Sequence, residues 1–242
     1  KQFSIKKEIS KKKKLRILDI TNKINQILNF PDSLTRTFQK KNLMMAILAA
    51  KICGLKISKI NNALRKIKNV TGRLELIKKF PNNVRVFIDY AHTPDALSEV
   101  LKSIKNEYGH NISLVFGCGG ERDTKKRPLM AKIAKLNCNK IYVTDDNPRN
   151  ENPSKIRKEI INNLKGSFFF NISDRLKAVK EAISNAEPNE IILIAGKGHE
   201  KYQDYGKKLI YISDKQIVKK IKIQKLKKKK INQKYLFNLK IF

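Results

Sequence analysis

The stretch ISLVFGCGGERDTKKRPLMAKIAKLNCNKIYVT, residues 112–144, holds a complete strand–helix–strand pattern. Its two ends, 112–116 and 140–144, are short and continuously apolar, and Arg127-Pro128 marks the opening of a helix between them. Continuous apolar runs indicate strands covered on both faces, as in a parallel sheet. The stretch therefore predicts an α/β fold.

The same alternation continues on both sides of this stretch. Apolar runs predict strands at 84–89, 112–116, 140–144, 168–172, 191–195 and 209–212. Capping residues or prolines predict helix starts at Thr93-Pro94, Arg127-Pro128, Asn152-Pro153, Ser173-Asp174 and Ser213-Asp214. Repeated strand–helix units predict a Rossmann-like, mostly parallel sheet with helices on both faces. Ligands of such folds bind at the carboxyl ends of the strands.

Two helices are expected before the sheet. Asn42 is predicted to cap NLMMAILAAKICGL, and Gly54 to end that helix. Because this segment is apolar on nearly every side, we expect it to be buried between layers. Ser58 is predicted to cap a second helix, which Gly72 ends.

Composition excludes several classes of protein. No apolar run approaches the roughly 18–20 residues that span a bilayer, and no apolar signal segment is visible. The three cysteines are widely spaced, without CxxC pairs, and the histidines offer no paired metal-ligand spacing. We therefore expect a cytoplasmic protein without a membrane span, a disulfide framework or a metal site made by its own side chains.

The net charge of +33 raises a nucleic-acid alternative. Only 10 of the 54 basic residues are arginines, the residues suited to bidentate phosphate and guanine contacts. The lysines are dispersed, and only 11–14 and 227–230 form dense blocks. This pattern favours a compositional bias, and a stand-alone basic α/β module that binds nucleic acid or another polyanion stays open as the alternative.

Polar segments follow four of the predicted strands. These are DYAHTPD (89–95), GCGGERD (117–123), DDNPR (145–149) and GKGHE (196–200). Each alone could be a capping loop, a tight turn or an Asx turn. Together, at one edge of a sheet, they predict a pocket with charges of both signs. Carboxylates for ammonium groups and arginine for a carboxylate would suit an amino acid with several charged groups.

These segments, with Gly72-Arg73-Leu74-Glu75 before them and KRPLM (126–130) after GCGGERD, resemble the Mur ligase family, and within it the MurE type. The resemblance covers about residues 36–220. It implies an ATP-dependent amide ligase of peptidoglycan precursor synthesis. Such a ligase activates UDP-MurNAc-L-Ala-D-Glu as an acyl phosphate, which the amino group of meso-diaminopimelate attacks, with ATP and Mg²⁺ as cofactors.

The resemblance also assigns residues, because DNPR is typical of members that add diaminopimelate rather than lysine. Its diaminopimelate-binding residues would be Arg122, Asp146, Asn147, Pro148, Arg149, Gly196 and Glu200. Its ATP-facing residues would be Asn42, Arg73, Asp89 and His92. No metal-ligating residue of the family can be placed in this sequence.

Departures from the family limit what the resemblance implies. The GxFN pattern reads Arg36-Thr37-Phe38-Gln39, and no GxxxxGK[ST] phosphate loop occurs in the sequence. The chain then corresponds to the end of an α/β central ATPase domain (1–78), a C-terminal domain (79–221) and a lysine-rich tail (222–242). We expect such a fragment to form no acyl phosphate alone. It could be a truncation, one half of a split enzyme with a separate partner polypeptide, or an inactive remnant.

Overall fold

The computed structural model describes residues 37–109 and 111–221. The chain divides into two compact units, Lys1–Asn69 and Val70–Phe242. The predicted lysine blocks at 11–14 and 227–230 lie outside the described residues, as do Arg36 and the tail at 222–242. Among the described residues, no helix is long and apolar enough to cross a membrane.

The first unit contains a pair of helices, α2 (Thr37–Ile52) and α3 (Ile57–Leu64). Their contact buries Leu43, Ile47, Ile60 and Leu64. Gly54, with φ +82°, lets the chain leave α2, and the N–H groups of Gly54 and Leu55 close the last turn on the carbonyls of Lys51 and Ala50. The predicted stop at Gly54 is therefore confirmed.

Three other expectations for this helix pair were wrong. Asn42 lies inside α2 and is exposed, because the helix begins five residues before it. Lys56, not Ser58, is the N-cap of α3. The apolar surface of α2 is not fully buried either, since Met45 is 51% and Ile52 71% exposed. The apolar composition of this helix indicated which side chains could be buried. Which of them are buried depends on the residues that pack against them.

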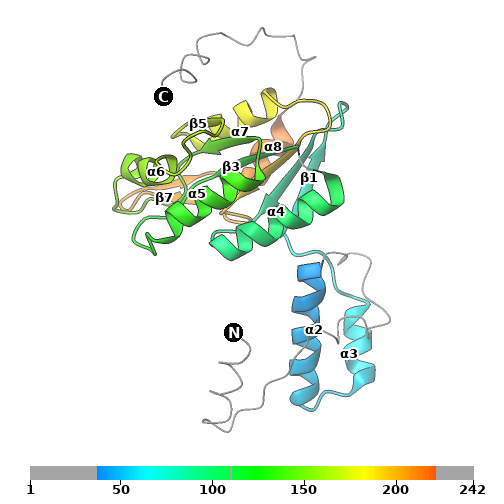
Figure 1. Ribbon diagram of the computed structural model, residues 1–242. Coiled ribbons are helices and arrows are strands. Elements are labelled where there is room, and N and C mark those ends of the chain that lie inside the picture. The colour runs from blue at the N-terminus through cyan, green and yellow to red at the C-terminus, as the bar shows by residue number, and fades with distance from the viewer. Residues whose placement is uncertain (1–36, 110, 222–242) are drawn as a thin grey trace. The chain divides into compact units, whose positions relative to one another are not determined.

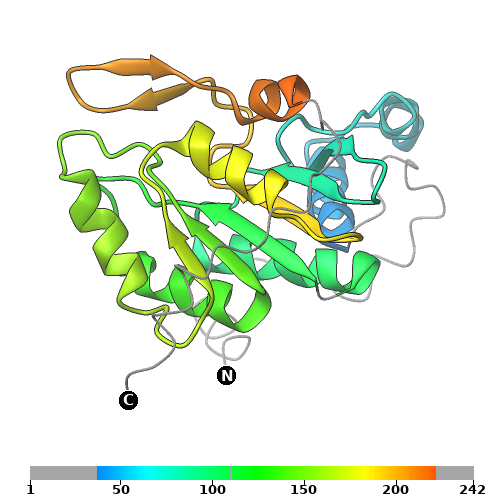
Figure 2. The same ribbon diagram turned by 90° about the horizontal axis from the view of Figure 1, so that it is seen from above.

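The second unit is built on a six-stranded sheet of order β1-β2-β6-β3-β4-β5 (Figures 1 and 2). The strands are β1 (Glu75–Lys79), β2 (Arg85–Asp89), β3 (Ile112–Phe116), β4 (Lys140–Val143), β5 (Phe169–Asn171) and β6 (Ile191–Ala195). All neighbours from β2 to β5 pair in parallel, and β1 pairs with β2 antiparallel. The predicted mostly parallel sheet is confirmed, and β1 is an edge strand that the sequence analysis did not anticipate.

Helices cover both faces of this sheet (Figure 1). They are α4 (Pro94–Tyr108), α5 (Lys126–Asn137), α6 (Pro153–Ile161), α7 (Arg175–Ser184) and α8 (Asp214–Lys220). Every residue of the central strands β3 and β6 is buried, which explains their continuous apolar sequences. On the α7–α8 face, Val86, Ile88 and Ile194 pack against Val179 and Val218 in one core cluster.

Helix starts agree closely with the predicted caps. The side chains of Thr93, Asn152, Asp174 and Ser213 each accept a backbone N–H of the first turn, and Pro94 and Pro153 occupy first-turn positions. Three of these caps, Thr93, Asn152 and Asp174, end loops that leave the carboxyl edge of the main sheet, so these local signals also fix where those loops stop.

The predicted strand at 209–212 exists, but it does not extend the main sheet. It forms β8 (Leu209–Tyr211), which pairs antiparallel with β7 (Tyr202–Asp204) in a separate two-stranded sheet. The N–H of Arg149 donates to the carbonyl of Asp204 at 2.8 Å, so this hairpin contacts the loop after β4. The predicted boundaries at 78/79 and 221/222, between the end of a central domain, a C-terminal domain and a tail, stay a prediction.

Candidate functional site

The polar loops after β2, β3, β4 and β6 converge on one cavity. Because β6 lies between β2 and β3, and β4 follows β3, the four carboxyl ends are neighbours in the sheet. Their loops line a cavity of about 530 Å³. The order of the strands, which the sequence does not state, is what brings the segments together.

Charges of both signs face this cavity. Its charged lining residues are Arg122, Lys126, Arg149, Asp123, Asp146 and Glu200. Three cations and three anions around one volume suit a ligand that carries both ammonium and carboxylate groups, as the sequence predicted. Gly117, Gly119 and Gly196 also line the cavity and leave backbone close to the ligand volume.

Asp146 presents a buried carboxylate to the cavity. Its Oδ1 accepts the N–H of Asn147 at 2.8 Å, while Oδ2 has no hydrogen-bond partner. A Cβ on Gly196 would lie 2.9 Å from that Oδ2, and Gly196 has φ +109°. Only glycine meets both requirements, so Gly196 is what allows Asp146 this position.

A fully buried guanidinium lies behind Asp146. Arg175, the first residue of α7, donates from Nε and Nη2 to the two carboxylate oxygens of Asp214 at 2.8 Å each, and from Nη2 to the carbonyl of Ala195 at 3.1 Å. Its Nη1 is 3.9 Å from Oδ2 of Asp146 and has no hydrogen-bond partner. The guanidinium therefore places a buried positive charge next to the Asp146 carboxylate.

Asn147 and Glu200 also line the cavity and form a hydrogen-bonded pair. Asn147 donates from Nδ2 to Oε2 of Glu200 at 3.0 Å. Burial raises the pKa of the Glu200 carboxyl, but hydrogen bonds from Lys197 and Asn147 outweigh it, and the net pKa is lowered. Glu200 is therefore an anion at neutral pH and suits a ligand ammonium.

Arg149 lies in the loop after β4 and lines the cavity. Its backbone has φ +53°, a left-handed conformation that costs a non-glycine residue roughly 1–2 kcal/mol. Its Nη1 donates to the carbonyls of Gly120 at 2.8 Å and Asn147 at 3.3 Å. Its Nη2 makes no hydrogen bond within the described residues, which leaves that nitrogen for a ligand carboxylate.

The remaining predicted diaminopimelate residues differ in exposure. Arg122 is exposed, lines the cavity, and makes no ion pair within the part of the chain that the structure describes. Pro148 is buried and does not line the cavity. Its carbonyl would be 2.0 Å from a Cβ on Gly120, so its contribution is to the packing of two loops.

The predicted ATP-facing residues do not all reach this cavity. His92 lines it, and its ring meets the edge of the Tyr90 ring at 4.7 Å. The guanidinium carbon of Arg73 lies over the Tyr90 ring, 4.6 Å from the ring centre. Asp89 is buried and accepts the N–H groups of Leu74 and Ala91 at 2.6 and 2.7 Å, so its oxygens tie together the backbone around the cavity. Asn42 lies in the first unit.

No metal site is supplied by the described residues. Residues 37–109 and 111–221 contain no group of three or more histidine, cysteine, aspartate or glutamate side chains placed to hold an ion. The Mg²⁺ that the family resemblance implies therefore does not fit ligands in this part of the chain, and we derive no step through it.

Lys197, Arg175 and Tyr90 were not singled out from the sequence. Lys197 stands inside the GKGHE segment, where its position between two glycines was the available signal. Arg175 follows a helix cap and has no sequence signal, because its partners Asp214 and Asp146 are distant in the chain. Tyr90 lines the cavity next to the predicted His92.

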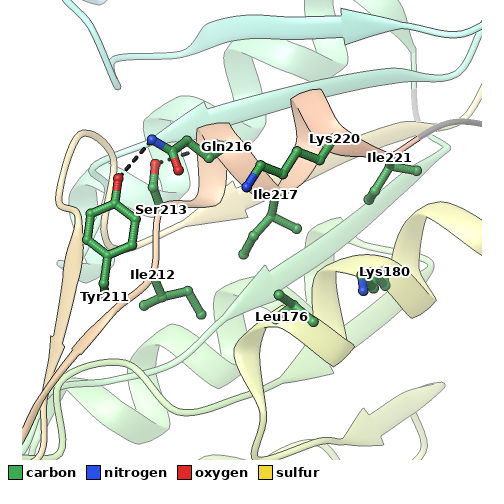
Figure 3. A pocket seen from close by; sticks show the side chains of 9 residues that line it. All are labelled: Leu176, Lys180, Tyr211, Ile212, Ser213, Gln216, Ile217, Lys220 and Ile221. Atoms are coloured by element: carbon green, nitrogen blue, oxygen red, sulfur yellow. Dashed lines mark hydrogen bonds between the residues drawn. The ribbon is translucent and has the colours of Figure 1, made fainter.

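A second hollow is apolar and holds none of the predicted site residues. It opens beside α7 and α8, where Leu176, Ile212, Ile217 and Ile221 supply the apolar walls (Figure 3). Its volume is about 290 Å³. Polar residues at its margin include Lys180, Lys220 and Gln216, and Nε2 of Gln216 donates to the Tyr211 hydroxyl at 2.8 Å (Figure 3). It lacks the paired charges of the first cavity.

A doubly covered parallel sheet with a cavity of mixed charge at its carboxyl edge defines an α/β ligand-binding domain. Comparison with known proteins is more specific. Residues 72–198, more than half of the chain, match the family "Mur ligase, glutamate ligase domain". The chain belongs to the Mur ligase family, and the resemblance seen in the sequence is confirmed.

Three similar proteins share one name. The chain is 44% identical over 195 residues to a UDP-N-acetylmuramoyl-L-alanyl-D-glutamate--2,6-diaminopimelate ligase of Rickettsia bellii, which covers 80% of this chain and 40% of that protein. It is 40% identical over 194 residues to the enzyme of that name from Haemophilus influenzae, covering 80% and 39%. A solved structure with that name matches with a TM-score of 0.59 at 35% identity, over 78% of this chain and 39% of the other.

A more distant match supports the fold alone. A FolC structure from E. coli, solved with ADP, gives a TM-score of 0.53 at 18% identity. The chain spans about two fifths of the length of the curated relatives it matches. The activity of those whole proteins is therefore a matter of proposal for this chain.

Proposed function

We propose that this chain is the amino-acid-binding part of a MurE-type ligase. Its substrate would be meso-diaminopimelate, which the whole ligase joins to UDP-MurNAc-L-Ala-D-Glu through an acyl phosphate in the cytoplasm. The observation that carries the proposal is the convergence of four polar loops on one cavity with three cations and three anions. The relatives' printed name supplies the amino acid.

The cavity has a partner for each charged group of one diaminopimelate head. Asp146 and Glu200 offer carboxylates to its ammonium group, and Arg149 offers a free guanidinium nitrogen to its carboxylate. Lysine has no carboxylate at that end, so it would leave Nη2 of Arg149 without a ligand partner, while Nε of Arg149 stays 3.7 Å from Oδ2 of Asp204. The cavity would then prefer diaminopimelate to lysine because only diaminopimelate gives Nη2 of the Arg149 guanidinium a carboxylate partner, and not because of its shape.

The chemistry of activation is proposed to depend on the rest of the ligase. No GxxxxGK[ST] segment occurs in this sequence, and the described residues supply no metal site. ATP would meet this chain at the rim formed by His92, Tyr90 and Arg73, whose rings and guanidinium lie together. Whether the rest of the ligase belongs to the same polypeptide or to a separate partner stays open in the proposal.

Calorimetric titration of the whole 242-residue chain tests the proposal. We expect meso-diaminopimelate to bind at least tenfold more tightly than L-lysine, since an Arg–carboxylate pair is worth about 1.5–3 kcal/mol. Arg149→Ala should abolish that preference. Lys132→Ala, which removes an exposed cation on α5, is the control and should keep it.

Two results would contradict the proposal. Equal affinity of the unchanged chain for both amino acids would remove the assigned role of Arg149. Absence of binding by a chain whose circular dichroism shows it to be folded would reject an amino-acid site in this part of the ligase.

A further inference from the structure

Lys197 is completely buried beside the cavity, although lysine is among the residues least often buried. Its side chain is 0% exposed, and it lies between two glycines directly after β6. Gly196 and Gly198 both have positive φ, +109° and +53°. This backbone turns the lysine inward instead of toward solvent. An ammonium group in such a place requires a full set of hydrogen bonds.

The Lys197 ammonium has that full set. It donates to Oδ1 of Asn147 at 3.1 Å, to Oε2 of Glu200 at 2.9 Å and to the carbonyl of Tyr202 at 2.5 Å. A lysine ammonium has three N–H bonds and no acceptor. All three are used by protein groups, so Lys197 has no N–H left for a ligand.

The first consequence concerns Asn147. Its Oδ1 accepts from Lys197 and from the backbone N–H of Asp204, at 3.1 Å each. Two donors on one oxygen fix which end of the amide is which, and the Nδ2 group must then face Glu200. Without the ammonium, one of the two constraints on the amide orientation is lost.

The second consequence concerns Glu200. One oxygen, Oε2, accepts from both Lys197 and Asn147. Burial raises the pKa of the Glu200 carboxyl, but these two donors, together with a hydrogen bond from Tyr90, lower it. Asn147 and Glu200 come from loops after different strands, and Lys197 joins them from behind the cavity wall.

We propose that Lys197 is the positioning residue of the amino-acid site, and that its buried ammonium holds the Asn147 amide and the Glu200 carboxylate in their orientation without touching the ligand. The inference rests on the proposed function for the identity of the ligand. The coupling between Lys197 and Glu200 is independent of the proposed function, because their contact exists without a ligand.

Nuclear magnetic resonance of the Glu200 carboxyl in the ligand-free chain tests the coupling directly. The unchanged chain should show a Glu200 pKa below the ordinary glutamate value, and Lys197→Met should raise it. Lys201→Met removes an exposed cation four residues later and should leave it unchanged. An ordinary Glu200 pKa in the unchanged chain would overturn the proposal, and this arm needs no variant to fold.

Titration with meso-diaminopimelate tests the effect on binding. Lys197→Met should weaken binding about tenfold or more at neutral pH, and binding should fail at a higher pH on acidification than in the unchanged chain. If Lys197 acts through Glu200, the double variant with Glu200→Gln should bind hardly more weakly than Glu200→Gln alone. Fully additive losses would show that Lys197 does not act through Glu200 and would overturn that part of the proposal.

The two arms separate the two claims. A raised Glu200 pKa in Lys197→Met, with no diaminopimelate binding by the unchanged chain, would support the positioning role and reject the proposed ligand. Binding of diaminopimelate by the unchanged chain, with a Glu200 pKa that is the same in Lys197→Met, would support the proposed ligand and reject the positioning role of Lys197.

Discussion

Two arginines in helices on opposite faces of the sheet are both fully buried, yet they have different surroundings. Arg127 in α5 pairs with Glu151 at 2.7 Å and Glu159 at 2.8 Å, and those carboxylates keep 21% and 34% of their side-chain surface exposed. Arg175 in α7 pairs with Asp214, which is also 0% exposed, and its remaining nitrogen faces Asp146.

This difference separates an arginine whose carboxylate partners are partly hydrated from one that is buried together with its partner. Arg127 joins α5 to α6 and donates to the carbonyl of Gly119 at 3.2 Å, with its two carboxylates partly hydrated. Arg175 is desolvated along with its partner, and burial, which alone would lower its pKa, is outweighed by Asp214, which raises it. Removing either arginine should therefore have a different cost.

The largest effect is expected for Arg175→Met. The substitution leaves Asp214 as a buried carboxylate without its partner, and breaking such a pair costs about 3–5 kcal/mol of unfolding free energy. Urea denaturation of both chains measures the loss. Arg175→Met combined with Asp214→Asn removes both charges and should recover part of it. A loss below about 1 kcal/mol for the single variant would show that the pair is dispensable.

Arg127→Met should cost less, about 1–3 kcal/mol, because Glu151 and Glu159 can turn toward water when the guanidinium is gone. The same urea experiment gives the comparison. A cost equal to or above that of Arg175→Met would mean that partial hydration of the carboxylates does not decide the difference. Lys132→Met, an exposed position on the same helix, should be within about 0.5 kcal/mol of the unchanged chain.

The smallest effect is expected from acid. The hydrogen bond from Arg127 lowers the pKa of the Glu151 carboxyl despite an opposing effect of burial. A carboxyl with a depressed folded-state pKa stabilises the fold above its unfolded value, about 4.3, and that contribution is lost as pH falls below it. Urea denaturation from pH 6 to pH 3 should show a steeper loss in the unchanged chain than in Glu151→Gln. Parallel curves would contradict the assignment.

The two arginines also show the limits of sequence analysis. Arg127 was recognised only as part of a helix start, and that start was nearly right, since α5 begins at Lys126. Its burial was not predictable, because Glu151 and Glu159 reach it from a loop and helix more than 20 residues away. Arg175 gave no signal for the same reason.

Among the strands, those with continuous apolar sequences were predictable and those without were not. The runs at 112–116 and 191–195 became β3 and β6 with the predicted bounds. The edge strand β1 reads ELIKK with mixed exposure, and β7 reads YQD, so neither has a burial pattern that distinguishes it from a loop. Both are strands because a neighbour offers backbone hydrogen bonds.

The sequence by itself determined the parallel sheet and the polar character of its carboxyl edge, because buried strands need apolar residues and helix starts need caps. Only the tertiary structure decided what each polar residue does there. Asp145 and Asp146 are adjacent, yet Asp145 pairs with Arg157 and the Tyr205 hydroxyl while Asp146 faces the cavity. In a loop no simple periodicity fixes the direction of a side chain, and the long-range partners that do so are known only once the chain has folded.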